Sequence, residues 1–126
     1  MKKILVALAL MMGAICVMGQ DVIGKQLTNN DLTYEITSTS TAKLISADKN
    51  ITIAYIPSTV TYDGLNYHVD KIGYKAFYKC QLLTSVTIPE SVTEIGSAAF
   101  WYCTSLTDII IPESVKKVGQ GAFSCC

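Results

Sequence analysis

Three of the five cysteines, Cys80, Cys103 and Cys126, follow one another at intervals of 23 residues. Such a series could bind a metal or form disulfide bonds in an exported protein. However, no Cys-x-x-Cys spacing supports a zinc site, and side chains at equivalent positions of a stacked repeat point in parallel rather than at one another. We expect Cys80 and Cys103 to be free, buried thiols, and Cys125 and Cys126 to be the pair that oxidises between molecules.

His68 is the only histidine in the chain. Catalysis by a Cys–His pair would require His68 to meet Cys80 or another exposed thiol, together with a third group that orients the imidazole. Nothing in the sequence arranges these groups, and glycine-rich phosphate loops and carboxylates at a catalytic spacing are absent. The sequence therefore predicts a protein that is not an enzyme, with no catalytic residues, no metal ligands and no cofactor.

The elements that position these side chains are copies of one repeat. Residues 72–94 and 95–117 are identical at twelve of 23 positions without a gap, and residues 118–126 begin a third copy. A fixed period of 20–29 residues is typical of a solenoid of the leucine-rich kind. We therefore predict a β-dominated repeat solenoid, a right-handed β/α coil whose parallel strands stack from coil to coil.

Within each repeat the order Leu-x-x-Val-x-Ile-Pro predicts one short strand. Positions two apart in a strand face the same way, so Val86 and Ile88 are expected to point into the coil and Ser85 and Thr87 to point out. Pro89 should end the strand. The segment that returns to the next strand is predicted to be a short helical turn or an irregular loop.

Glycine and phenylalanine recur in the return segment. Gly73, Gly96 and Gly119 stand where the chain must turn sharply, and we expect them to adopt positive φ. A phenylalanine stands four residues after each of these glycines. The three rings should stack as an apolar spine, and they belong to Phe77, Phe100 and Phe123.

The first 19 residues have the pattern of a secretory signal peptide, with a basic start, an apolar stretch and Gly19 at the expected cleavage position. Removal of Lys2 and Lys3 with this segment would leave eight lysines and ten acidic residues, so the net charge changes from 0 to 8 − 10 = −2. There is no basic stripe for nucleic acid, and no other apolar stretch is long enough to span a membrane.

Residues 20–56 are predicted to form an N-terminal β cap that merges into a degenerate first repeat strand. Residues 21–30 are polar and are expected to lead into the fold. Residues 32–37 and 41–47 alternate in hydrophobicity and should pair as an antiparallel hairpin. Residues 51–56 should form the degenerate strand, and the solenoid should occupy residues 57–126. An insertion at about residues 61–69 contains Asp-Gly, which predicts a small hairpin that projects from the first coil.

This pattern resembles the BspA-like leucine-rich repeat family. The residues that carry the resemblance are Ile95-Gly96-x-x-Ala99-Phe100-x-x-Cys103-x-x-Leu106-x-x-Ile109-x-Ile111-Pro112-x-x-Val115 and the insertion Thr61-Tyr62-x-Gly64-x-x-Tyr67-x-Val69. The resemblance implies a secreted or surface-displayed bacterial protein, and some members bind host proteins or other cells.

Outward positions of the strands should form two rows on the sheet, and solenoids bind ligands on such surfaces. The predicted binding surface consists of Ile53, Ser85 and Asp108 in one row and Tyr55, Thr87 and Ile110 in the other. The favoured function is a secreted or surface-displayed, adhesin-like protein-binding module whose ligand is a host or cell-surface protein. The alternative is a structural assembly unit, or a truncated fragment of a longer surface protein without binding activity of its own.

The aromatic residues Tyr78, Trp101 and Tyr102 lie at positions that differ between repeats. They are either contact residues on the return side or side chains partly buried between coils, and we favour partial burial. The apolar residues of the last coil have a coil on one side only, which predicts end-to-end self-association or fraying from about Thr104.

Overall fold

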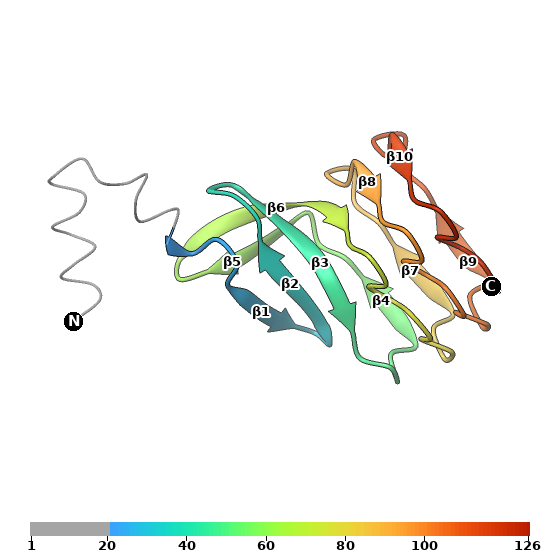
Figure 1. Cartoon of the computed structure of the whole chain (residues 1–126). Coiled ribbons are helices and arrows are strands. Elements are labelled where there is room, and N and C mark those ends of the chain that lie inside the picture. The colour runs from blue at the N-terminus through green and yellow to red at the C-terminus, as the bar shows by residue number, and fades with distance from the viewer. Residues whose placement is uncertain (1–20) are drawn as a thin grey trace, which may run out of the picture.

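The computed structural model describes residues 21–126, in which short strands alternate with tight turns (Figure 1). The predicted signal peptide and its cleavage position lie outside these residues. The strands of the described part are β1 (Gln26–Asn29), β2 (Leu32–Ile36), β3 (Thr41–Ala47), β4 (Ile53–Tyr55), β5 (Thr59–Tyr62), β6 (Leu65–Ile72), β7 (Ser85–Thr87), β8 (Glu94–Ile95), β9 (Asp108–Ile110) and β10 (Lys117–Val118). They form one sheet of seven strands and one of three.

The predicted N-terminal hairpin is present as β2 and β3, which pair antiparallel. Residues 21–30 were expected to be a polar leader, but they contain the strand β1, which pairs antiparallel with β2. This strand escapes detection because it is an edge strand whose residues are largely exposed, so its sequence carries no alternation of apolar residues.

The insertion in the first coil is the hairpin of β5 and β6, whose turn residues Asp63 and Gly64 have φ of 52° and 81°. Positive φ at both central residues is the geometry that an Asp-Gly hairpin turn provides. The hairpin does not simply project, because β6 also pairs in parallel with β3 and Val60 and Tyr67 are buried. The strand β6 therefore joins the cap to the solenoid.

Two parallel ladders run along the solenoid. The strands β4, β7 and β9 form the three-stranded sheet, and β6, β8 and β10 form the second ladder within the larger sheet. The strand β4 lies within residues 51–56, where the degenerate repeat strand is predicted, and it is paired in parallel with β7. Each coil thus contributes one strand to each sheet, and the three coils give the β-dominated solenoid that the period predicts.

The return segments are successions of turns, which corresponds to the irregular loop of the two alternatives predicted for them. Lys75 and Lys79 have φ of 55° and 59°, and Ala98 and Tyr102, one repeat later, have 56° and 61°. In this segment every second N–H group points at the next coil. The resulting hydrogen bonds run from Lys75 N to Ser97 O (3.2 Å), from Phe77 N to Ala99 O (2.7 Å) and from Lys79 N to Trp101 O (2.8 Å).

The repeated glycines serve close packing and not positive φ, which corrects the sequence expectation. Gly73, Gly96 and Gly119 are not among the residues with positive φ. A Cβ on Gly96 would lie 2.8 Å from Gly73 C and 2.8 Å from Tyr74 N, and a Cβ on Gly119 would lie 2.3 Å from Ser97 N. Gly96 and Gly119 therefore let the backbone contact that of the preceding coil, and Gly73 does the same against Leu44 O of the cap strand β3.

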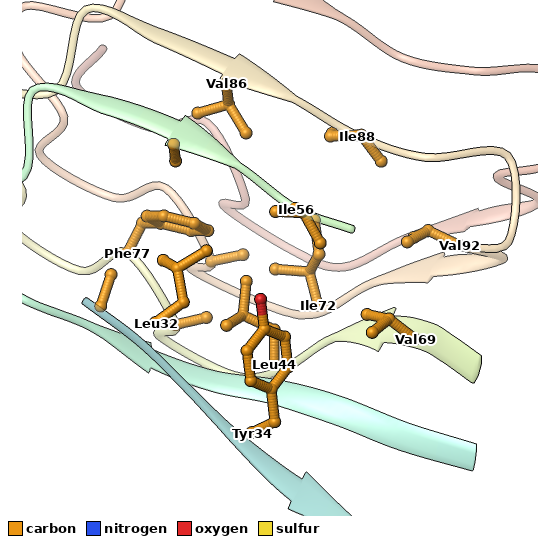
Figure 2. Packing of buried hydrophobic residues seen from close by; sticks show 14 of the residues in the cluster. Leu32, Tyr34, Leu44, Ile56, Val69, Ile72, Phe77, Val86, Ile88 and Val92 are labelled. Carbon is orange, nitrogen blue, oxygen red and sulfur yellow. The ribbon is translucent and has the colours of Figure 1, made fainter. Parts of the chain in front are cut away.

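The predicted phenylalanine spine is confirmed. The ring centroids of Phe77 and Phe100 are 4.9 Å apart with planes 7° from parallel, and those of Phe100 and Phe123 are 5.1 Å apart at 4°. In Figure 2 Leu32 of the cap lies beside Phe77, and Tyr34 points into the same cluster as Ile56 and Ile72 of the first coil. One continuous core therefore joins the cap to the coils.

Burial decreases in the last coil. Ile88 is 8% exposed but its equivalent Ile111 is 40% exposed, and Ile95 is 0% exposed whereas Val118 is 51% exposed. We call the partly covered apolar surface of the last coil the end face, and it comprises Leu106, Ile109, Ile111, Val115, Val118 and Phe123. Within residues 21–126 no helix is long and apolar enough to cross a membrane.

Candidate functional site

The two predicted rows of outward side chains are aligned in the structure. Parallel pairing places Ile53 opposite Ser85 and Ser85 opposite Asp108, and it places Tyr55 opposite Thr87 and Thr87 opposite Ile110. We call these six residues the strand-face rows. All six lie on one face of the three-stranded sheet because outward positions alternate with the buried residues Ala54 and Val86.

The strand-face rows expose large apolar side chains on a regular sheet. Ile53 is 66% exposed, Tyr55 is 69% exposed and Ile110 is 83% exposed. A hollow of about 360 Å³ lies over β7 and β9 and includes Ser85, Thr87, Asp108 and Ile110 in its lining. Asp108 is the only charged member of the rows. This composition suits a contact with another macromolecule, in which apolar surface is removed from water.

The cysteine series is a column of hydrogen-bond donors and not a reactive site. Cys103 Sγ donates to Phe77 O at 3.1 Å, and Cys126 Sγ donates to Phe100 O at 3.0 Å. All four cysteines of the described residues are free; Cys80 and Cys103 are buried, as expected, and Cys125 and Cys126 are exposed. Burial raises the pKa of the Cys103 thiol to about 12, which disfavours the nucleophilic thiolate.

The other candidates for chemistry remain separate. His68 is exposed on β6, where it pairs with Thr41 and Thr59. Between Asp21 and Cys126 no group of three or more His, Cys, Asp or Glu side chains is placed to hold a metal ion. The candidate sites that the described residues offer are therefore extended surfaces.

The return side carries a second surface, which sequence reasoning identified only in part. Tyr78 and Trp101, which are half-buried, and Tyr102, which is 39% exposed, lie side by side there, so both sequence interpretations hold in part. Centroid distances are 5.4 Å from Tyr78 to Trp101 and 5.6 Å from Trp101 to Tyr102. We call this the lysine–aromatic surface, and it consists of Lys49, Tyr74, Lys75, Tyr78, Lys79, Trp101 and Tyr102.

Sequence analysis did not identify the lysines of this surface, because none of them belongs to a recognised motif. The positions at which the two repeats differ could have identified them. Tyr74, Lys75, Tyr78 and Lys79 are replaced one repeat later by Ser97, Ala98, Trp101 and Tyr102. These four positions differ while the residues that build the coil stay the same, so the fold does not dictate their chemistry.

Comparison with known proteins bears on the fold and the family. The profile of a BspA type leucine-rich repeat region (6 copies) matches residues 50–126. No curated protein matches the chain.

Solved structures of bacterial leucine-rich repeat proteins resemble this one. A leucine-rich cell surface protein from Faecalibacterium prausnitzii A2-165 is 39% identical with a TM-score of 0.70, over 80% of this chain and 28% of that protein. A leucine-rich repeat protein from Bacteroides ovatus is 38% identical with a TM-score of 0.75, over 79% of this chain and 27% of that one. A leucine-rich repeat protein from Bacteroides capillosus is 38% identical with a TM-score of 0.73, over 78% and 73% of the two chains.

The match to the Faecalibacterium and B. ovatus proteins therefore spans less than a third of their length. The family profile covers more than half of this chain, and the cysteine, glycine and phenylalanine positions that build its coils lie inside the matched range. The chain belongs to the BspA type leucine-rich repeat family.

Proposed function

We propose that this chain is a secreted or surface-displayed protein-binding module, adhesin-like and without enzymatic activity, that contacts its ligand through the strand-face rows. The observation that carries the proposal is the exposure of Ile53, Tyr55 and Ile110 on one face of rigid, stacked strands. Leucine-rich repeat proteins typically present such surfaces to other proteins, and a host or cell-surface protein is the partner class we favour. The description of the Faecalibacterium relative as a cell surface protein supports the location.

The physical basis is a preorganised surface. The backbone of these strands loses little further conformational entropy when a ligand binds, because the parallel ladder already holds it, so ordering costs are confined to the side chains. The polar residues Ser85 and Thr87 occupy the central strand β7, and the exposed apolar residues Ile53, Tyr55 and Ile110 lie on the strands to either side. A protein ligand that spans the sheet would thus bury apolar contacts on both sides of central hydrogen-bonding groups.

The test is a binding screen against a panel of purified extracellular and cell-surface proteins. The informative variant replaces Tyr55, Thr87 and Ile110 together by alanine, and all three side chains are exposed, so the fold should persist. A matched control replaces the exposed apolar residues Leu65 and Leu82 by alanine. Binding that is lost in the triple variant and kept in the control supports the proposal. Equal binding by the triple variant, or no binding to any panel member, contradicts it.

A second candidate function, assembly through the end face, is favoured by the exposure of Ile111 and Val118. Apolar surface of this kind is stabilised when another coil, or another copy of the chain, covers it. Sedimentation of the isolated chain tests this candidate, as argued in the Discussion.

A further inference from the structure

Three ammonium groups converge on the ring of Tyr78. The Nζ atoms of Lys75, Lys79 and Lys49 lie 4.6, 5.3 and 5.8 Å from its centroid. Lys75 also lies 5.2 Å from the ring centroid of Tyr74, and Lys49 donates a hydrogen bond to Tyr78 O. The ring attracts each cation, but it cannot cancel the repulsion among three like charges. The cluster is therefore a site of positive potential.

No carboxylate of the described residues neutralises this cluster. The ion pairs found between residues 21 and 126 are Lys43 with Glu35 and Lys117 with Glu94, both elsewhere. Asp48 is next to Lys49 in sequence, but its Oδ1 accepts the N–H of Asn50 at 2.8 Å within the turn. The electrostatic complement of the lysines must come from an anionic partner.

Trp101 lies between two hollows on the same side of the molecule. One hollow, of about 820 Å³, is lined by Tyr78, Trp101 and Tyr102 together with Lys49, Lys79 and Gln81. The other, of about 390 Å³, includes Trp101, Tyr74 and Gln120 in its lining. Because the hollows share Trp101, they offer an elongated track across two coils, which suits a linear polymer better than a small molecule.

The track recognises its ligand through side chains. Main-chain N–H groups of Lys75, Phe77 and Lys79 are bonded to carbonyl groups of the next coil, so they are not available to pair with a peptide strand. Three lysines in a chain without arginine are also few for a nucleic acid, whose binding commonly neutralises about six to ten phosphates.

We propose that the lysine–aromatic surface binds an acidic polysaccharide, whose sugar rings carry carboxylate or sulfate groups. The faces of aromatic rings are electron-rich and attract the positively polarised C–H groups of a sugar ring. Trp101 and Tyr102 supply such rings, the amide of Gln81 supplies hydrogen bonds to hydroxyl groups, and Lys49, Lys75 and Lys79 pair with the acidic groups. This site is distinct from the strand-face rows.

Trp101 is the only tryptophan, so its fluorescence reports directly on the proposed site. The whole chain is titrated with polygalacturonate and dextran sulfate as acidic polysaccharides, with dextran as the neutral control, and with polyglutamate and oligothymidylate as other polyanions. We expect a saturable change with the acidic polysaccharides and none with dextran. An equal response to polyglutamate or oligothymidylate at equal charge would overturn the assignment to a polysaccharide.

Matched lysine variants separate this site from general charge attraction. The pair Lys49→Gln and Lys79→Gln removes two exposed charges at the site, and the pair Lys25→Gln and Lys116→Gln removes two exposed charges elsewhere. We expect the first pair to weaken affinity about tenfold and the second to change it less than about twofold. Equal effects of the two pairs would overturn the proposal.

The stacking contribution is tested by Tyr102→Ala, with circular dichroism as the measure of folding. We expect weaker binding of the acidic polysaccharides by folded protein; unchanged binding would overturn the stacking role. The Tyr55, Thr87 and Ile110 alanine variant should bind the polysaccharide like the wild type. If the strand-face rows prove to bind no protein ligand, the expected polysaccharide binding by the lysine–aromatic surface is therefore unaffected.

Discussion

Cys103 Sγ donates a hydrogen bond to Phe77 O across 3.1 Å, from one coil to the preceding one. The same contact joins Cys126 to Phe100 at 3.0 Å, so the thiol occupies a structural position that the repeat reproduces. A small side chain with a weak donor fits this site, which lies beside the stacked phenylalanine rings.

The first prediction concerns thiol reactivity. Because burial raises the pKa of Cys103 to about 12 and also raises that of Cys80, both should react slowly with iodoacetamide at pH 8 in the folded, reduced protein. Cys125 and Cys126 are exposed and should react before Cys80 and Cys103. Cys125 should react before Cys126, because partial burial raises the pKa of the Cys126 thiol and its Sγ donates to Phe100 O. Peptide mass mapping after timed quenching measures the order, and urea-unfolded protein is the control in which Cys80 and Cys103 also react. Rapid modification of folded Cys103 would contradict the burial described here.

The second prediction concerns Tyr34, whose hydroxyl points into the core (Figure 2). Its oxygen has no hydrogen-bond partner among the described residues, so Tyr34→Phe should raise the free energy of unfolding by about 1 kcal/mol at pH 7. Urea unfolding of both proteins measures this difference. A loss of more than about 1 kcal/mol would show that the hydroxyl makes a stabilising contact.

The difference in free energy of unfolding between Tyr34→Phe and the wild type should also depend on pH in the alkaline range. Burial raises the pKa of Tyr34 from 10.0 to about 12, so between these values the folded protein keeps a proton that the unfolded chain has lost. This contribution to stability is complete below pH 10 and is lost as pH rises toward 12, at about 1.4 kcal/mol per pH unit. The advantage of Tyr34→Phe over the wild type should therefore grow above pH 10. An advantage that stays constant to pH 11.5 would contradict the shift.

The third prediction contrasts two glycines. Gly96→Ala places a Cβ 2.8 Å from backbone atoms of the preceding coil, which cannot yield as a side chain does, and it should cost about 2–3 kcal/mol. Gly121→Ala meets only Ser124 Oγ, at 3.3 Å, and its φ of 66° should cost about 1 kcal/mol. Ala98 already adopts φ of 56° at the equivalent position. Urea midpoints measure the two costs, and a cost at Gly96 no larger than that at Gly121 would show that the contact between coils does not require glycine at position 96.

Much of the solenoid was predictable because a period of 23 residues sets the register. Once Val86 faces inward, the pairing of Thr87 with Ile110 and the stacking of Phe77 on Phe100 follow from the repeat. The pairing of β6 with β3 was not predictable, since it joins segments that share no repeat. The same holds for Lys49, which lies in a turn before the first coil and reaches Tyr78, 29 residues later, only through the fold.

The last prediction concerns the end face. The cap covers the first coil, where Ala54 and Ile56 are buried, so the partly covered apolar surface lies at the opposite end of the solenoid (Figure 1). Two copies of this polypeptide cover both end faces when their last coils join, and such an interface is isologous and closes at two subunits. We therefore expect a concentration-dependent dimer rather than a filament. Val118→Lys should favour the monomer, because Val118 is on the end face, whereas Ile53→Lys, on the strand-face rows, should leave the equilibrium unchanged. Analytical ultracentrifugation measures both variants, and a monomer at all concentrations, or growth beyond the dimer, would contradict this arrangement.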